Sequence, residues 1–172
     1  MYTYLLDTYK ENDLTYDSFN KGKLESQLAY DGNYKAYFEF IADSLKRYSS
    51  QRDKQKGEAF VHGFTLAMTS QNQFYRPISE LDNDGGYADI FLSPLCDIYK
   101  DMVDSYIIEL KYSKTNTADE QLQVLFKEAS AQICRYANSD IVKESVKTTK
   151  LHKLVVIYRG AEMVMCEEVT EE

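Results

Sequence analysis

Apolar positions along the chain recur with two periods, which predict an order of helices and strands. A period of three to four residues predicts helices at 34–48, about 57–69 and about 118–137. Short apolar or alternating runs predict strands at 75–79, about 87–92, 105–112, 153–158 and 162–169. This order of elements predicts an α/β fold, a mixed central β-sheet flanked by helices.

The segments outside these elements are polar. Residues 1–24 are tyrosine-rich and show no clear period, and 49–56 (SSQRDKQK) is typical of a connector. The run 80–86 (ELDNDGG) is typical of a turn, with Asp82 and Asp84 as turn residues, because its glycines accept positive φ. We predict a domain at 57–172, preceded by an N-terminal helical extension at 1–56.

The three predicted helices each have an apolar stripe, which in the helix at 34–48 consists of Tyr34, Tyr37, Phe38, Phe40, Ile41, Leu45 and Tyr48. In the helix at about 57–69 the stripe consists of Phe60, Val61, Phe64, Ala67 and Met68, while the other face carries Glu58, His62, Thr65 and Thr69. In the helix at about 118–137 the inward positions are Leu122, Leu125, Phe126, Ala129, Ile133 and Tyr136. We expect the last two stripes to pack against the sheet.

The strand at 105–112 carries two charged side chains in an apolar sequence. Glu109 and Lys111 are two residues apart and therefore point to one face, while the intervening apolar side chains point to the other. Asp89 lies on the preceding strand, in GYADIFL. If the two strands are neighbours, Asp89, Glu109 and Lys111 converge on one spot.

An aspartate on one strand and Glu-x-Lys on the next is typical of metal-dependent phosphodiesterases. Hard divalent cations such as Mg²⁺ (or Mn²⁺) neutralise charge, activate water and prefer oxygen ligands. Asp89, Glu109 and the Leu110 carbonyl would supply such oxygens, and Lys111 would orient or help to deprotonate the attacking water. The alternative is a Glu/Lys pair on the solvated face of an antiparallel sheet.

Other polar residues have two interpretations each. Glu58 is a further metal or water ligand, or an acidic residue that interacts favourably with the helix dipole. His62 would be a metal ligand or a general acid, or alternatively a packing residue. Gln132 and Tyr136, one turn apart, orient the water or hold a phosphate, or are ordinary polar groups of a helix.

The net charge and its distribution along the chain bear on the expected affinity for nucleic acid. The net charge is −8, and residues 58–110 hold 2 basic and 9 acidic side chains, whereas 111–159 hold 9 basic and 5 acidic. The balance predicts modest affinity for nucleic acid, or a partner that supplies it. No apolar run reaches membrane-spanning length, and three cysteines without a CxxC motif suggest neither disulfides nor zinc. We expect a cytoplasmic protein without membrane contact.

The segments GEAFVHGF, GGYADIFLSP, SYIIELKY and EASAQICRY together resemble the PD-(D/E)XK nuclease superfamily, and more narrowly the C-terminal nuclease domain of bacterial AAA-ATPase-like proteins. The resemblance implies a restriction-endonuclease-like core and a site made of Glu58, Asp89, Glu109, Lys111, Gln132 and Tyr136. The sequence departs from the family pattern in two places: Ala88 precedes Asp89 where the family name has proline, and Tyr87 stands where many relatives have arginine.

The resemblance also implies a function and partners. We expect a Mg²⁺-dependent or Mn²⁺-dependent nuclease that cleaves DNA rather than RNA, with 1–56 as the remnant of, or linker from, an AAA-ATPase-like domain of a parent protein. The alternatives are a non-catalytic interaction module that retains the nuclease fold and couples to an ATPase, and a hydrolase of small phosphoesters.

Overall fold

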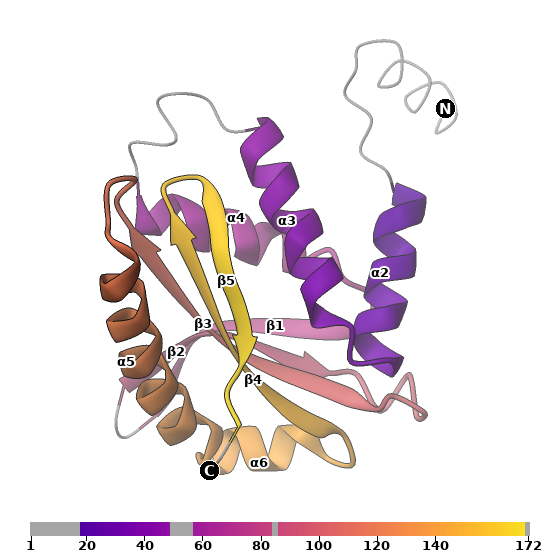
Figure 1. Ribbon diagram of the computed structural model, residues 1–172. Helices are drawn as coiled ribbons and strands as arrows, with labels where there is room; N and C mark the ends of the chain where they lie inside the picture. The colour runs from indigo at the N-terminus through magenta and orange to yellow at the C-terminus, as the bar shows by residue number, and fades with distance from the viewer. Residues whose placement is uncertain (1–17, 49–56, 84–85, 171–172) are drawn as a thin grey trace.

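A computed structural model of the chain describes residues 18–48, 57–83 and 86–170 (Figure 1). A five-stranded sheet has its strands in chain order, β1-β2-β3-β4-β5. The strands are β1 (Tyr75–Asn83), β2 (Gly86–Pro94), β3 (Asp104–Ser113), β4 (Lys150–Arg159) and β5 (Glu162–Glu168). The helices are α2 (Ser18–Tyr30), α3 (Tyr34–Tyr48), α4 (Glu58–Thr69), α5 (Asp119–Ala137) and α6 (Asp140–Val146).

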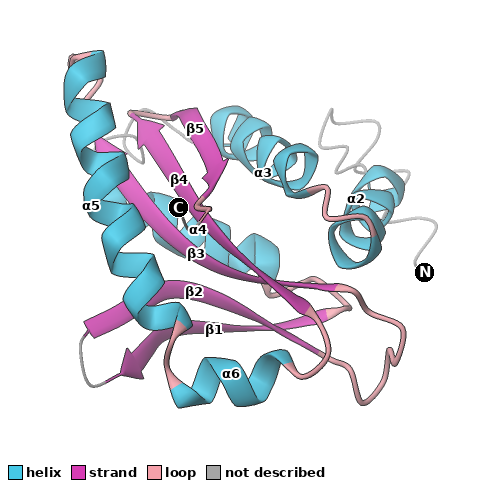
Figure 2. Cartoon of the chain, turned by 60° about the horizontal axis from the view of Figure 1, so that its bottom comes forward, coloured by secondary structure: helices cyan, strands magenta, loops and turns pink. Residues whose placement is uncertain are grey.

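The sheet is mixed, as predicted. β3 and β4 are parallel and are connected through α5 and α6, while the other neighbouring strands are antiparallel. β2 pairs with β1 along almost its whole length but with β3 only from Ile90↔Ile108 to Leu92↔Tyr106. Before Ile90, β2 diverges from β3, as the ribbons in Figure 2 show. The predicted site lies at this divergence.

Each face of the sheet has its own hydrophobic core. Tyr106, Ile108 and Leu110 face α2, α3 and α4, as the alternation along β3 predicts. Ile107 faces α5 and α6, together with Phe91 and Val155. β3 is apolar on both faces because helices cover both of them, as is usual for strands beside a parallel connection.

Several predicted elements are confirmed. The helices at 34–48, about 57–69 and about 118–137 correspond to α3, α4 and α5. The expected strand at 162–169 is β5, and the strand at 75–79 is the first part of β1. The α/β class with a mixed sheet flanked by helices, and with helices N-terminal to it, is therefore correct.

The prediction that residues 1–24 are irregular is wrong for residues 18–24, which begin α2. Leu24, Leu28 and Ala29 are buried in the same core as the sheet, while Phe19 is 86% exposed. The apolar positions of α2 are too few to give a clear period. Tertiary packing therefore stabilises this helix more than its local pattern does. Residues 1–17 and the connector at 49–56 lie outside the described part of the chain.

The turn predicted at 80–86 is shorter than expected. β1 continues to Asn83 and β2 starts at Gly86, so Asp82 is a strand residue and only 84–85, which are not described, connect the strands. Backbone pairing with β2 outweighs the weak strand propensity of the acidic and amide residues in this run. Asp84 falls outside the described residues.

The predicted stripe of α4 is partly wrong. Val61 and Met68 are buried as expected, but Phe60 and Phe64 are only half-buried and Ala67 is exposed. Thr65 and Thr69 are buried instead. Their hydroxyls can be buried because they donate to the carbonyls of Val61 and Thr65 within the helix. The helix is thus rotated toward its threonine side, which brings His62 close to the sheet. One missed helix, α6, follows α5 and is capped by the Ser139 hydroxyl, which accepts from the Val142 N–H.

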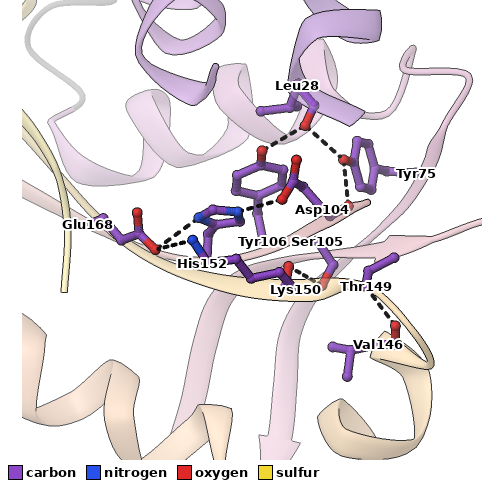
Figure 3. A network of polar contacts seen from close by, with 10 residues as sticks. All are labelled: Leu28, Tyr75, Asp104, Ser105, Tyr106, Val146, Thr149, Lys150, His152 and Glu168. Atoms are coloured by element: carbon purple, nitrogen blue, oxygen red, sulfur yellow. Dashed lines mark hydrogen bonds and ion pairs between the residues drawn. The ribbon is translucent and has the colours of Figure 1, made fainter. Parts of the chain in front are cut away.

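A buried polar network fixes the opposite end of the sheet, far along β3 and β4 from the predicted site (Figure 3). His152 of β4 places Nε2 at 2.8 Å from Asp104 of β3 and Nδ1 at 2.9 Å from Glu168 of β5. The Tyr106 ring stacks on His152, and the Tyr106 hydroxyl donates to the Leu28 carbonyl of α2. The network therefore joins three strands to the N-terminal helices.

The helices at 18–48 share a core with the sheet. The domain boundary at residue 56 stays a prediction. That this segment derives from an ATPase-like domain stays a prediction. None of the described helices is long and apolar enough to cross a membrane.

Candidate active site

Asp89 lies on β2, one residue before the strand begins to pair with β3 at Ile90. One carboxylate oxygen, Oδ2, accepts a hydrogen bond of 2.8 Å from the Leu110 backbone N–H. The side chain therefore occupies the position that a backbone carbonyl of a paired strand would take. A strand residue points its N–H and its C=O to the same edge, so the Leu110 carbonyl also faces the side where Asp89 lies.

Glu109 lies in the middle of β3 and is fully buried. Its Oε1 accepts a hydrogen bond of 2.7 Å from the Lys111 amino group, while Oε2 is buried without a hydrogen-bond partner. A buried carboxylate oxygen without a partner is costly. The site therefore has one strong acceptor that the described protein atoms leave free.

Lys111, Gln132 and Tyr136 form a chain of hydrogen bonds between β3 and α5. Lys111 Nζ lies 3.3 Å from Gln132 Oε1, and Gln132 Nε2 donates at 2.8 Å to the Tyr136 hydroxyl. Tyr136 is buried, so its ring fixes the position of the hydroxyl. The helix thereby holds the lysine from the side opposite to Glu109.

α4 approaches the site from the other face of the sheet. Glu58 occupies the first position of the helix and is exposed. His62, one turn later, is half-buried, and its Nε2 lies 3.1 Å from the Asp89 carbonyl oxygen and 3.3 Å from Ser79 Oγ. His62 therefore contacts the main chain of Asp89 and not its carboxylate.

The electrostatics of the site follow from burial and from the closeness of the acids. Burial and the charge of Asp89 raise the pKa of Glu109 to about 7, although Lys111 opposes this rise. Burial also raises the pKa of Asp89, against the Leu110 hydrogen bond and the positive charge of Lys111. For Lys111, burial lowers the pKa, but the hydrogen bond and charge of Glu109 outweigh it and raise the pKa overall.

The structure brings together most of the predicted residues. Asp89, Leu110, Glu109, Lys111, Gln132 and Tyr136 are linked by one continuous set of contacts. Glu58 joins them only through its charge, which acts on Asp89, Glu109 and Lys111. In the described part of the chain no group of three or more His, Cys, Asp or Glu side chains is arranged to hold a metal ion. The role of each residue stays a prediction.

Sequence reasoning did not identify Ser79 or the contact between His62 and the Asp89 carbonyl. Ser79 lies on β1 opposite Ile90, so only the pairing of β1 with β2 places it near His62. His62 has a local signal, its place one turn after Glu58. The main-chain target of its ring depends on the rotation of α4 and could not be read from the helix alone.

The model of the PD-(D/E)XK nuclease superfamily matches residues 56–168. The comparison with curated proteins and the comparison with solved structures each found no match. The matched range contains the whole sheet, both acidic strands and the Lys111–Gln132–Tyr136 contacts, and the chain belongs to the PD-(D/E)XK nuclease superfamily.

Proposed function

We propose that this protein is a metal-dependent nuclease, a phosphodiesterase that hydrolyses DNA rather than RNA. The observation that carries the proposal is the free Oε2 of Glu109. This buried oxygen belongs to a carboxylate that faces Asp89 on the neighbouring strand and contacts Lys111 at 2.7 Å. A carboxylate pair with a lysine at its side suits a reaction in which negative charge develops on a phosphate.

The residues present fit a hard divalent cation. Asp89, Glu109 and the Leu110 carbonyl would supply oxygen ligands, with Glu58 in support from α4. Burial is the main cause of the raised pKa of Glu109, and the repulsion from Asp89 that adds to it favours a positive charge between the two carboxylates. A bound Mg²⁺ or Mn²⁺ ion stabilises charge on a phosphate and makes bound water more acidic.

Lys111 stays charged, because its raised pKa lies above the neutral range. A charged amino group donates hydrogen bonds and cannot take a proton. Of the two roles expected for Lys111, orienting the attacking water and balancing charge therefore fits better than deprotonation. Gln132 and Tyr136 hold the amino group in place for this role.

The charge of the segment around the site is less favourable for binding nucleic acid than the site itself is for binding a metal ion. Residues 58–110 hold 2 basic and 9 acidic side chains, and this segment includes Asp89 and Glu58. Phosphate contacts depend on Lys and Arg. We therefore propose that nucleic acid is captured with help from the AAA-ATPase-like portion of a parent protein, in the cytoplasm.

The same acidity favours a second candidate, a non-catalytic module that keeps the fold and couples to the ATPase-like portion.

The variant Lys111→Ala distinguishes the nuclease from the non-catalytic module. Supercoiled plasmid and single-stranded DNA are incubated with Mg²⁺ or Mn²⁺ at low salt, with the domain alone and joined to the ATPase-like portion. Nuclease function predicts cleavage that falls by about 10²–10⁴-fold in Lys111→Ala, the usual effect of losing a group that handles the nucleophile.

Two results would change this conclusion. Cleavage that persists unchanged in Lys111→Ala belongs to a different site or to a contaminant. Absence of cleavage by the wild type, even when joined to its ATPase-like portion, favours the non-catalytic module. A crystal soaked in Mn²⁺ tests the metal site without knowledge of the substrate, because anomalous scattering locates the ion directly.

A further inference from the structure

His62 lies where α4 meets the β1–β2 hairpin. Its Nε2 is 3.1 Å from the carbonyl oxygen of Asp89 and 3.3 Å from Ser79 Oγ. α4 packs on the face of the sheet that carries Ile90 and Ile108, whereas α5 packs on the other face. His62 therefore reaches Asp89 from the side opposite to Lys111 and Gln132.

The chemistry of the contact fixes the state of the ring nitrogen. A backbone carbonyl only accepts hydrogen bonds, so His62 Nε2 carries the hydrogen and donates it to Asp89. A nitrogen that carries hydrogen has no lone pair for a metal ion. His62 is thus not a ligand through Nε2, and its contact with the site passes through the main chain of Asp89.

Asp89 needs such support because of its place in the sheet. The ladder between β2 and β3 starts at Ile90↔Ile108, one residue after Asp89. The carboxylates of Asp89 and Glu109 face each other across the divergence and repel. Leu110 holds the side chain of Asp89, and His62 holds its peptide group.

We propose that His62 is a positioning residue that fixes the main chain of Asp89, so that the Asp89 and Glu109 carboxylates face the same divalent cation. The inference rests on the proposed metal-dependent function. Groups that hydrogen-bond to metal ligands and orient them usually contribute about 10–100-fold to metal affinity. Loss of the His62 donor should therefore weaken metal binding without removing any ligand.

Two substitutions at this position separate hydrogen bonding from packing. His62→Leu places an apolar side chain of similar size at this position and removes the donor. His62→Gln carries an amide NH₂ at about the distance of Nε2 and can donate to the Asp89 carbonyl. Mn²⁺ affinity, measured by calorimetry at a temperature where both variants are folded, should fall by about 10–100-fold in His62→Leu. His62→Gln should retain most of the affinity.

Ser79→Ala is the matched control, because it removes the other contact of Nε2 and leaves the donor to Asp89 in place. It should bind Mn²⁺ nearly as the wild type does. If Ser79→Ala weakens binding as much as His62→Leu, the contact with β1 and not that with Asp89 is responsible, and the proposal is wrong. Failure of His62→Gln to restore affinity likewise contradicts it.

The remaining outcomes separate this inference from the proposed function. Wild-type affinity in His62→Leu overturns the role of His62 and leaves the metal site intact, whereas absence of Mn²⁺ binding in the wild type removes both. If His62→Leu does not fold, long-range ¹H–¹⁵N spectra of the metal-free wild type decide the matter. We expect hydrogen on Nε2, and a ring protonated on Nδ1 alone overturns the proposal.

Discussion

The Leu110 backbone N–H donates a 2.8 Å hydrogen bond to the Asp89 carboxylate, at the point where β2 and β3 part. An acidic side chain thus replaces the backbone acceptor that a continued ladder would offer. One oxygen of Asp89 is held in place before any ligand arrives, and the other remains available. Preorganisation of this kind reduces the cost of binding an ion between Asp89 and Glu109.

Asp89→Asn should separate the charge of Asp89 from its hydrogen bond. The asparagine side-chain oxygen can still accept from Leu110, so the fold should persist, and the metal-free variant should be at least as stable as the wild type because a half-buried charge is gone. Mn²⁺ should raise the melting temperature of the wild type but not of Asp89→Asn. Thermal melts with and without Mn²⁺ measure both effects, and an equal Mn²⁺ shift in the two proteins would exclude Asp89 as a ligand.

The stability of the metal-free protein should depend on pH through Glu109. Its pKa is raised from 4.5 to about 7 in the folded state, so between these values the folded state holds a proton that the unfolded state has lost. Stability is therefore fully present below about pH 4.5 and falls as pH rises to about 7. Urea denaturation at several pH values should show this fall in the wild type.

Glu109→Gln provides the control for this pH dependence. The variant cannot ionise at this position, so its free energy of unfolding should change less between pH 5 and pH 7.5, with a smaller residual slope from Asp89, whose pKa is also raised. Mn²⁺ should stabilise the wild type at pH 7.5 and not Glu109→Gln. A slope as steep in the variant as in the wild type would assign the pH dependence to other groups.

The sequence predicted the two faces of β3 well because strand alternation is a local property. Glu109 and Lys111 had to share a face, and Tyr106, Ile108 and Leu110 had to share the other, whatever the partners of the strand. The link from Lys111 to Gln132 and Tyr136 needed the position of α5 as well. The resemblance to a known family supplied it.

The errors concern elements whose position depends on distant contacts. α2 has few apolar residues, and its position depends on packing against α3 and the sheet. The rotation of α4 depends on Thr65 and Thr69, whose hydroxyls are satisfied within the helix and can be buried. A pattern of apolar and polar positions counts threonine as polar and takes no account of hydrogen bonds within the helix. It therefore does not predict that Thr65 and Thr69 are buried. The role of His62 was left open for the same reason.

Tyr136→Phe should test whether the hydrogen-bond chain on α5 matters for the reaction. Phenylalanine keeps the buried ring, so the core of α5 should be preserved, but Gln132 loses the hydroxyl that accepts from its amide at 2.8 Å. Gln132 and Lys111 should then be less well positioned, and the cleavage rate should fall by about 10-fold or more, as for other residues that orient a functional group. Mn²⁺ affinity should change little, since Gln132 and Tyr136 neither are proposed ligands nor hydrogen-bond to one directly. A loss of Mn²⁺ binding equal to the loss of rate would contradict this division of roles.

His152→Ala should destabilise the fold without affecting the site. Its ring lies between Asp104 and Glu168, with Nε2 at 2.8 Å from the first carboxylate and Nδ1 at 2.9 Å from the second. Removal of the ring leaves the Asp104 carboxylate buried without this partner, and a buried polar group left without its hydrogen-bond partner typically costs about 1–3 kcal/mol.

The control for His152→Ala is Lys150→Ala, because Lys150 contacts the same Glu168 at 3.8 Å from an exposed position. An exposed pair of this kind contributes about 0–1 kcal/mol, so the control should unfold nearly as the wild type does. Urea denaturation measures both free energies, and Mn²⁺ calorimetry on the folded proteins should give the same affinity for all three. His152 pairs with Tyr106, whereas Lys111 pairs with Ile157, so five residues along β3 and β4 separate the network from the site. A change in Mn²⁺ affinity in His152→Ala would show that the two ends of the sheet are coupled.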